Sequence, residues 1–309
     1  NALKGDTFTS LEKKLGYIEE AILPTVDMVL AAGDIFNVPR PEYRVANCML
    51  KFVKQCPNFW YIPGQHDMDS RVLSDNTVLS LLDGEQNVSR LSCAIPHRYI
   101  GDEFPVYVYG IKYSDNVEDM RTDVKELNKR IKTLKTTALG SPAKYIVLMH
   151  GPIFGNTLPH WAKKGWTHKM LAEELCEADL VHVGDVHEAF ITYGKPIVVN
   201  TGPILRMSSR DTQIRPAPCI VDLSSMYVEF CPLPFRKEKV FSKPLTDSVS
   251  NKDQQILNAL EDISKKISEG VTSWTDPELL ELVGKSKLSA DVKQVLTKMM
   301  QKVIEAKQK

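Results

Sequence analysis

The sequence has no excess of charge of either sign, since its 309 residues include 39 lysines and arginines and 39 aspartates and glutamates. Proteins that hold nucleic acid by bulk charge are strongly basic, so this balance excludes that mode of binding. Any nucleic-acid contact would have to be confined to a local groove, where metal ions can also neutralise phosphate.

Paired cysteines are absent as well. The six cysteines are scattered, none forms a C-x-x-C pair, and no spacing among them fits a zinc site. A chain of this length can bury a sizeable core without cross-links. We therefore expect reduced thiols, mostly small core residues, in a cytoplasmic protein, or in the host cytoplasm if the source is viral.

Long hydrophobic runs are also lacking. No apolar run approaches the roughly 20 residues that a membrane-spanning helix needs, and no signal peptide is visible. Hydrophobic residues make up 43% of the chain and charged residues 25%, which is typical of a soluble globular protein. We therefore expect no membrane partner.

Short apolar segments alternate with helical patterns over the first 232 residues. Leu11, Leu15, Ile18 and Ile22 recur at helical spacing, and Pro24 ends that helix. We predict further helices at 41–56 and 116–139, and strands at 26–32, 59–62, 106–109, 145–149, 180–183, around the turn at 193–195 and over 219–231. This alternation predicts an α/β fold.

The composition changes after about Pro232. Proline, serine and lysine become more frequent, and three stretches have helical periodicity. We predict a first domain over 1–232 and a mainly helical C-terminal region over 233–309. The last helix of that region is amphipathic, a pattern typical of core packing that can also serve to dock a partner.

Four of the predicted strands end in loops of one design. Each loop combines glycine with aspartate, histidine or a side-chain amide, and open α/β sheets place their sites at such strand ends. The four segments are Gly33-Asp34-Ile35-Phe36-Asn37, Gly64-Gln65-His66-Asp67, His150-Gly151 and Gly184-Asp185-Val186-His187.

Carboxylate, amide and imidazole groups together suit Mn, Fe or Zn ions. Two cations about 3.5–4 Å apart can hold the oxygens of an anionic phosphodiester and lower the pKa of a bridging water. A carboxylate such as Asp34 can bridge both ions, and a histidine such as His66 can protonate the leaving oxygen. Each motif alone is common in turns, so it is the ordered set of four that predicts a metal site.

The order of these motifs resembles the signature of the calcineurin-like metallophosphoesterases: G-D-x-x-[DN], G-N-H-[DE], a histidine at a strand end, then G-H-x-H. The resemblance runs from Val26 to about Asp222. Within it, residues 33–41 (GDIFNVPRP) are similar to the G-D-L-F-x-x-x-[RK]-P stretch of the SbcD/meiotic-recombination-eleven DNA nucleases. Residues 200–208 (NTGPILRMS) are similar to their P-G-S-x-x-R-x-S segment.

The resemblance implies roles for six residues. Asp34 matches the bridging carboxylate, and His66 matches the catalytic histidine. The implied metal ligands are Asp34, Gln65, His150, Asp185 and His187, where Gln65 replaces an asparagine and Asp185 replaces the first histidine of G-H-x-H.

Three departures accompany the resemblance. The D-x-H motif that opens the signature is absent, and we expect it to belong to native residues that precede Asn1. Gln65 is one methylene longer than asparagine, so its loop must shift for the carbonyl to ligate. Asp185 substitutes an anion for a neutral imidazole, which favours a hard metal such as Mn²⁺.

The resemblance also implies a fold, a reaction and partners. The fold is a four-layer sandwich of two mixed β-sheets flanked by helices, followed by the small C-terminal helical domain. The reaction is exonucleolytic or endonucleolytic hydrolysis of DNA with two Mn²⁺ ions, for which Mg, Fe or Zn are alternatives. The implied partners are DNA, an SbcC-type ABC ATPase that meets the C-terminal region, and a second copy of the chain.

Five further residues are candidates for substrate binding: Asn37, Arg40, Lys163, Lys164 and Arg206. The two lysines share a segment with Trp161, Trp166 and His168. This segment could grip a nucleic-acid strand by stacking and charge, although a packed loop with solvated lysines is the more common case. Arg40 and Arg206 could reach phosphate or face solvent. We interpret His182, inside a predicted strand, as structural.

Two other functions fit the same residues. One is hydrolysis of small phosphodiesters or phosphomonoesters, against which the GDIFNVPRP stretch and the C-terminal region argue. The other is a non-catalytic DNA-binding scaffold with a degenerate site, which the missing D-x-H motif and the substitutions at Gln65 and Asp185 favour.

Overall fold

The computed structural model describes residues 6–69, 77–114, 116–137, 142–159, 162, 165–206 and 214–234. The chain divides into two compact units, Asn1–Ser242 and Lys243–Lys309, and the second lies wholly outside the described residues. The predicted boundary after residue 232 and the helical character of 233–309 therefore stay predictions.

The first sheet contains three parallel strands in the order β1 (Val29–Ala32), β2 (Phe59–Ile62) and β3 (Val88–Arg90). Its outer face is covered by the helices α1 (Phe8–Ala21), α2 (Tyr43–Gln55) and α3 (Leu79–Leu82). The helix α1 begins because the Thr7 side chain accepts the backbone N–H of Ser10, and it gives way to the 3₁₀ turn η1 (Leu23–Thr25), which contains Pro24.

The second sheet is mixed and has six strands in the order β10-β11-β9-β6-β5-β4. Its four central strands are parallel, and the two edge strands β10 and β4 are antiparallel to their neighbours. The strands are β4 (His97–Ile100), β5 (Pro105–Ile111), β6 (Lys144–Gly151), β9 (Leu180–Asp185), β10 (Phe190–Thr192) and β11 (Ile197–Asn200).

Two helices cover the outer face of the second sheet, α4 (Val117–Thr137) and α5 (His168–Glu174). Four apolar residues of α4 recur at spacings of four and three and are fully buried: Met120, Val124, Leu127 and Ile131. This spacing places them on one face of the helix, which explains why α4 packs along its length.

Two small strand pairs complete the described structure. The strands β7 (Ile153–Phe154) and β8 (Trp166–Thr167) are parallel, and β12 (Cys219–Asp222) and β13 (Tyr227–Phe230) form an antiparallel hairpin. A short 3₁₀ turn, η2 (Gln65–Asp67), follows β2.

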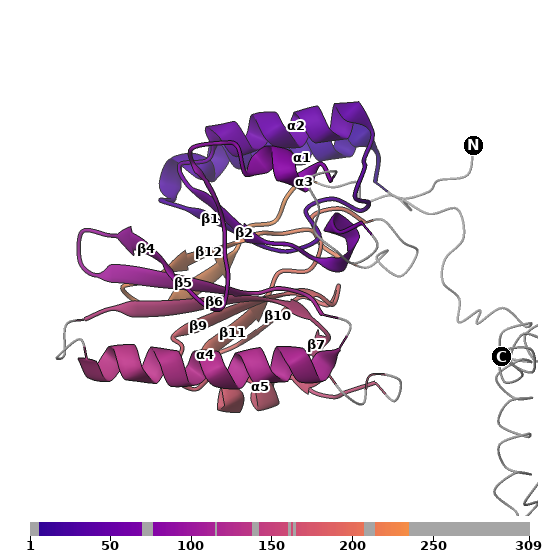
Figure 1. Cartoon of the computed structure of the whole chain (residues 1–309). Coiled ribbons are helices and arrows are strands. Elements are labelled where there is room, and N and C mark those ends of the chain that lie inside the picture. Colours follow the sequence, from indigo (N-terminus) through magenta and orange to yellow (C-terminus); the bar gives the residue numbers. More distant parts are fainter. Residues whose placement is uncertain are drawn as a thin grey trace, which may run out of the picture. The chain divides into compact units, whose positions relative to one another are not determined.

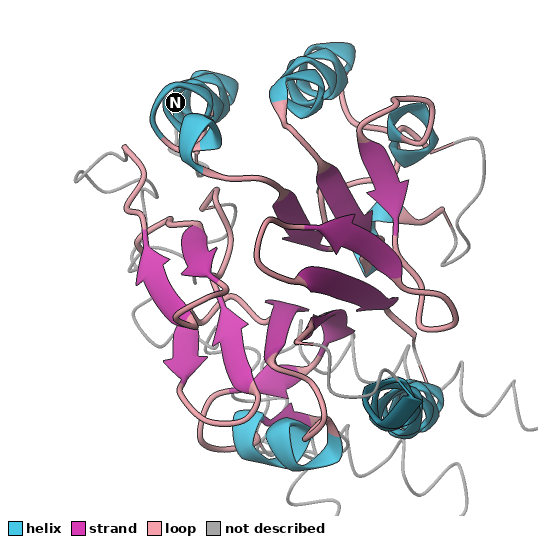
Figure 2. Ribbon diagram, turned by 90° about the vertical axis from the view of Figure 1, so that its left-hand side faces the viewer, coloured by secondary structure: helices cyan, strands magenta, loops and turns pink. Residues whose placement is uncertain are grey.

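The two large sheets face each other across an apolar core. Trp60 and Ile62 of the first sheet pack there with Ile146 and Leu148 of the second, and Val228 of the hairpin joins them. Figures 1 and 2 show the resulting order of helices, sheet, sheet and helices. The predicted α/β class and four-layer arrangement are confirmed.

The first sheet differs from the prediction of two mixed sheets, because its described strands are all parallel. Helical crossovers through α2 and α3 join these strands, and such crossovers return the chain in the same direction. No helix among the described residues is both long enough and apolar enough to cross a membrane.

The cysteines agree only in part with the prediction of small core residues. All six are free thiols, but only Cys56 is buried. Cys176 is exposed, whereas four others are partly buried and pack against the hydrophobic core: Cys48, Cys93, Cys219 and Cys231.

A buried charge cluster attaches α1 to the loop after β11. The Asp6 carboxylate lies 2.7 Å from Lys14 Nζ and 3.0 Å from Arg206 Nη2, and all three side chains are at most 3% exposed. Lys14 also donates to the carbonyl of Ile204. Burial alone would raise the pKa of Asp6, but the hydrogen bonds from Arg206 and Lys14 outweigh it and lower the pKa to about 2.

Replacing Asp6 should destabilise the protein strongly. Asp6→Asn leaves Lys14 and Arg206 buried without a counter-charge, so we expect the free energy of unfolding to fall by about 3–5 kcal/mol in urea titrations at pH 7. The exposed Glu12→Gln on the same helix is the control and should change it by less than about 0.5 kcal/mol. Equal stability of the two variants would contradict this account.

His182 should make stability depend on pH. It pairs with Leu148 and Val199, which belong to the core between the sheets, and burial lowers its pKa from 6.5 to about 4. As the pH falls, His182 is therefore protonated in the unfolded chain before it is protonated in the folded protein. The stability that depends on a neutral His182 is complete above pH 6.5 and is lost as the pH falls towards 4. Between pH 7 and pH 4, unfolding free energies of the wild type should fall by roughly 3 kcal/mol more than those of His182→Leu. Equal losses would refute the assignment.

Candidate metal centre

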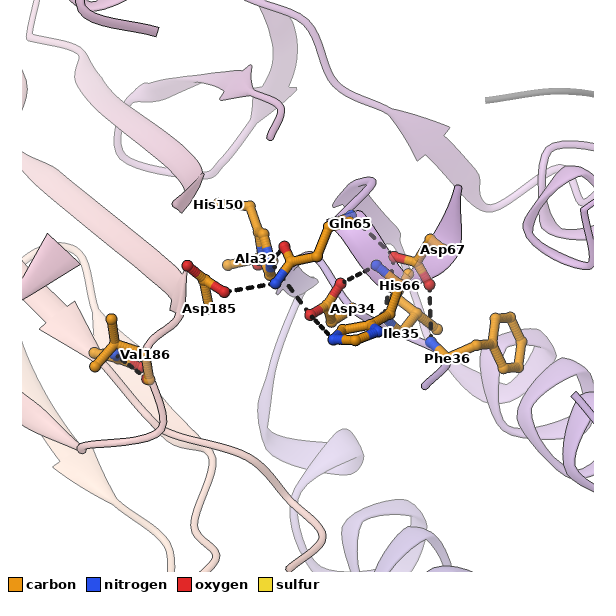
Figure 3. Close-up of polar contacts among 12 residues, drawn as sticks. Ala32, Asp34, Ile35, Phe36, Gln65, His66, Asp67, His150, Asp185 and Val186 are labelled. Atoms are coloured by element: carbon orange, nitrogen blue, oxygen red, sulfur yellow. Dashed lines mark hydrogen bonds and ion pairs between the residues drawn. The ribbon is translucent and has the colours of Figure 1, made fainter. Parts of the chain in front are cut away.

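The carboxyl ends of β1, β2, β6 and β9 meet at one edge of the molecule. Asp34 follows β1, Gln65 lies in η2 directly after β2, and His150 and Asp185 lie near the ends of β6 and β9. These side chains point toward one another, as Figure 3 shows. The first sheet thus supplies one half of the site and the second sheet supplies the other.

Glycines allow this approach. Gly33 has a φ of +85°, and a Cβ there would lie 2.2 Å from Nδ1 of His150. A Cβ on Gly184 would lie 2.2 Å from the carbonyl oxygen of Ala32, and one on Gly64 would lie 2.2 Å from Oδ1 of Asp34. Since real contacts are never so short, any other residue at these positions would push the loops apart.

The two aspartates of the site hold unusual backbone conformations. Asp34 has a φ of 49° and Asp185 a φ of 92°. Non-glycine residues rarely adopt positive φ, and such residues are concentrated at functional sites, where the surrounding structure holds them in place. Here the backbone turns each carboxylate toward the other sheet.

Three residues are placed to hold a metal ion. Asp34, His150 and Asp185 each offer one ligand atom, and these atoms lie within 4.8 Å of one another. Nε2 of His150 is 3.4 Å from Oδ2 of Asp34. Two carboxylates and an imidazole at this separation form the donor set that Mn²⁺, Fe²⁺ or Zn²⁺ takes in proteins.

The orientation of His150 fits a ligand. Its Nδ1 lies 2.5 Å from the carbonyl oxygen of Ala32, which can only accept a hydrogen bond. Nδ1 therefore carries a proton, and Nε2 faces the carboxylates, as in metal-binding histidines whose second nitrogen donates to a carbonyl. Burial alone would lower the pKa of His150, but the hydrogen bond and charge of Asp34 outweigh it and raise the pKa.

The amide of Gln65 lies between His150 and Asp185. Its Oε1 is 2.7 Å from Nε2 of His150, and its Nε2 donates to Oδ1 of Asp185 at 2.6 Å. The amide oxygen is thus a fourth donor within the cluster. His150 also acts on Asp34. Burial alone would raise the pKa of Asp34, but the hydrogen bond and the charge of His150 outweigh it and lower this pKa.

His66 lies on the solvent side of the cluster. Its backbone N–H donates to Oδ1 of Asp34 at 2.9 Å, its ring Nε2 is 3.9 Å from Oδ2 of the same carboxylate, and its side chain is 52% exposed. The ring is therefore beside the donor group and open to a molecule arriving from solvent, which suits a proton donor.

Asp67 is a positioning residue that the sequence did not single out. Its buried carboxylate accepts the backbone N–H groups of Ile35, Phe36 and Gly64, and so joins the loop after β1 to the loop after β2. Burial raises its pKa to about 6 in spite of these donors. The signal was present in the Gly64–Asp67 motif, where an aspartate at the third position of a helical turn can reach back to the cap.

The other predicted residues lie outside this group. His187 is exposed in the loop after β9 and is not among the three residues whose ligand atoms converge. Asn37 is exposed, and Arg40 forms an exposed ion pair with Asp69 at 2.6 Å. Arg206 is buried against Asp6, so its placement does not support contact with substrate.

The segment predicted to grip nucleic acid is packed where the structure describes it. Trp166 is fully buried, its Nε1 donates to Glu174, and the guanidinium of Arg121 lies 4.6 Å from its ring centre. His168 is also buried. For these two residues the packed-loop interpretation is the correct one, whereas Lys163, Lys164 and Trp161 lie outside the described residues.

No protein-family model matches the sequence, and no curated protein matches it. Several solved structures are similar to the chain in part. The protein TT1561 of Thermus thermophilus is 14% identical over 73% of this chain and 93% of its own, with a TM-score of 0.45. The sulfate thiohydrolase SoxB of Thermus thermophilus is 13% identical over 72% of this chain and 44% of its own, with a TM-score of 0.44.

The NAD nucleotidase NadN of Haemophilus influenzae is 15% identical over 72% of this chain and 43% of its own, with a TM-score of 0.36. The chain thus spans less than half the length of SoxB and of NadN. These similarities are too weak to assign a role to any residue, so the roles of the site residues are argued from the geometry of this chain alone.

Gly33→Ala should damage the site specifically. The positive φ alone costs about 1–2 kcal/mol of stability for alanine, and the new methyl group would displace the His150 ring. We expect calorimetry to show Mn²⁺ affinity reduced at least tenfold. The control is Gly16→Ala in α1, which meets nothing within 4 Å and should stabilise the protein by about 0.5–1 kcal/mol with unchanged Mn²⁺ affinity. Unaltered Mn²⁺ affinity in Gly33→Ala would count against His150 as a ligand.

Proposed function

We propose that the chain is a divalent-metal-dependent phosphodiester hydrolase with DNA as its substrate. The observation that carries the metal chemistry is the convergence of Asp34, His150 and Asp185 within 4.8 Å, with His66 beside them. The choice of DNA is supported by the resemblance of residues 33–41 and 200–208 to segments of the SbcD/meiotic-recombination-eleven nucleases.

In this proposal Asp34, His150, Asp185 and the amide oxygen of Gln65 hold the ion, with Mn²⁺ as the preferred metal because most of these donors are oxygens. When bound, a divalent ion supplies positive charge for the phosphate oxygens and lowers the pKa of a water. Among the described residues only this one group of His, Cys, Asp and Glu ligands converges. A second ion, as the resemblance implies, would share Asp34.

His66 acts on the leaving group. As the bond from phosphorus to the sugar oxygen breaks and a bond to the water oxygen forms, the imidazole donates its proton to the departing oxygen. Asp34 positions this ring, because it accepts the His66 backbone N–H and lies next to Nε2. The buried Asp67 holds the same turn from beneath through its three backbone N–H contacts.

Partners follow from the same resemblance. We propose that residues 233–309 meet an SbcC-type ABC ATPase and that two copies of the chain associate. A second candidate function, hydrolysis of small phosphodiesters, is favoured by one observation: Arg40 pairs with Asp69 and Arg206 with Asp6, so two of the cations predicted to bind DNA phosphates already have carboxylate partners.

His66→Ala tests the catalytic assignment. The variant should bind as much Mn²⁺ as the wild type in elemental analysis, because His66 is not a ligand, while hydrolysis of linear DNA should fall 10²–10⁴-fold, on the order expected for a lost proton donor. Lys13→Gln, at an exposed position of α1, serves as the control and should retain activity.

Two measurements on the wild type separate the candidate functions. Turnover of linear DNA well above that of bis(4-nitrophenyl) phosphate would support the nuclease, and the reverse would support a small-molecule hydrolase. Absence of bound Mn²⁺ together with intact DNA binding would leave the scaffold function. Full DNA hydrolysis by His66→Ala would remove the assigned role of that residue.

A further inference from the structure

The outer surface of α4 carries an uneven distribution of charge. From Lys125 to Thr137 the helix has five basic residues, Lys125, Lys129, Arg130, Lys132 and Lys135, and one acidic residue, Glu126. The first turns are acidic on balance, with Glu118, Asp119 and Asp123 against one basic residue, Arg121. In a chain without net charge, this separation makes the second half of α4 a local cationic surface.

Three of these lysines form one ridge. Lys125, Lys129 and Lys132 follow at spacings of four and three, so they lie on one face of the helix. The buried stripe from Met120 to Ile131 lies on the opposite side, against the sheet, and all three lysines are exposed. None of the three ammonium groups has a carboxylate partner among the described residues. We call Lys125, Lys129 and Lys132 the lysine ridge.

The flanking basic residues are held in place. Arg130 donates to the carbonyl of Ala94 at 2.7 Å and lies 3.9 Å from Glu126. Lys135 donates to the carbonyl of Glu177 and lies over the Tyr145 ring at 5.2 Å. Glu126, the one acidic residue of this half of the helix, therefore lies beside Arg130. The exposed positive charge of this surface comes mainly from the lysine ridge.

A largely buried aromatic pair lies between the cationic half of α4 and the edge strand β4. Tyr145 stacks on Tyr107 with ring centres 5.4 Å apart, and the exposed Arg98 of β4 lies over Tyr107 at 5.9 Å. Tyr145 is 2% exposed and both rings pack with the core beneath α4, so the pair supports this surface from below and Arg98 adds an exposed charge to it.

We propose that the lysine ridge is a second nucleic-acid contact, separate from the metal centre, and that it binds the phosphate backbone. The ridge rises about 10 Å along the helix axis, at 1.5 Å per residue, which matches roughly three successive phosphates of one strand. Its contacts would be ionic and independent of sequence.

The ridge is displaced from the metal centre along the fold. The strand β5 ends near the catalytic edge and leads into the start of α4, whereas the end of α4 leads back to the start of β6, at the opposite end of that strand from His150 and Gly151. Figure 1 shows α4 on the outer layer, with β7 near its first turns. A nucleic acid that contacts the ridge therefore does so away from the reacting phosphodiester, so the ridge affects binding and not the chemical step.

The choice of DNA as the ligand of the ridge rests on the proposed function, but DNA binding is measured separately from hydrolysis. Binding of a labelled 30-base-pair DNA duplex is measured by fluorescence anisotropy in EDTA over a series of KCl concentrations. Lys125→Gln/Lys129→Gln/Lys132→Gln should bind at least tenfold more weakly at 100 mM KCl. The slope of log affinity against log salt should fall by about 2–3, because each lost phosphate contact removes about 0.9.

A triple variant with the same charge change elsewhere serves as the control. Lys13, Lys51 and Lys195 are exposed on α1, on α2 and before β11, and their replacement by glutamine should leave affinity and salt slope unchanged. Mn²⁺-dependent hydrolysis of bis(4-nitrophenyl) phosphate should be the same in the ridge variant and the wild type.

Three outcomes would overturn the inference: no binding of the duplex by the wild type, equal losses in both triple variants, or equally tight binding of poly-L-glutamate through the same lysines, which would indicate an acidic protein partner. If the ridge variant loses DNA affinity while the wild type hydrolyses no phosphodiester, the ridge stands and the proposed hydrolase fails. If hydrolysis is found but the ridge variant binds normally, the hydrolase stands and the ridge fails.

Discussion

The contact between Gly33 and the ring of His150 is the constraint on which the site depends. It joins the end of a strand in the first sheet to the end of a strand in the second, and the hydrogen bond from His150 to the carbonyl of Ala32 fixes it. Because there is no side chain at Gly33, two sheets that are otherwise separated by a layer of core side chains come within hydrogen-bond distance at one edge. Asp34 and Asp185 face each other only because of this approach.

Gln65 and Asp185 are in direct contact with each other. The Gln65 amide donates to the Asp185 carboxylate at 2.6 Å. The additional methylene of Gln65 gives the amide the reach to contact His150 and Asp185 at once. Both polar atoms of the Gln65 amide are thus hydrogen-bonded within the cluster, which avoids the free-energy cost of a partly buried polar group without a partner.

The sequence predicted the elements that have a strong local pattern. Apolar runs ending in Gly-Asp, Gly-Gln-His or His-Gly located β1, β2, β6 and β9. The shared strand-end position of these loops placed Asp34, Gln65, His66, His150 and Asp185 near one another, as the structure does. The short strands β3, β4, β7 and β8 were missed, because none of them is an apolar run that leads into such a loop.

Burial of single polar residues could not be predicted in the same way. Arg206 and Trp166 have partners that are distant in sequence or hidden in the packing, namely Asp6 and Glu174, and no spacing connects them. The position of His187 depends on how the chain leaves β9, where the positive φ of Asp185 turns the loop. A motif indicates which residue types are present, and it does not specify the direction of a loop after an unusual backbone angle.

The division of the ligands between two sheets has a consequence for folding. A cation held by Asp34 from one sheet and by His150 and Asp185 from the other would act as a cross-link between halves of the domain that otherwise adhere through apolar side chains such as Trp60 and Leu148. Ion binding and packing of the two sheets are then thermodynamically linked. The free energy by which the bound ion stabilises the packed sheets equals the free energy by which packing favours ion binding. Residues of the inter-sheet core, which never meet the ion, thereby become determinants of metal affinity.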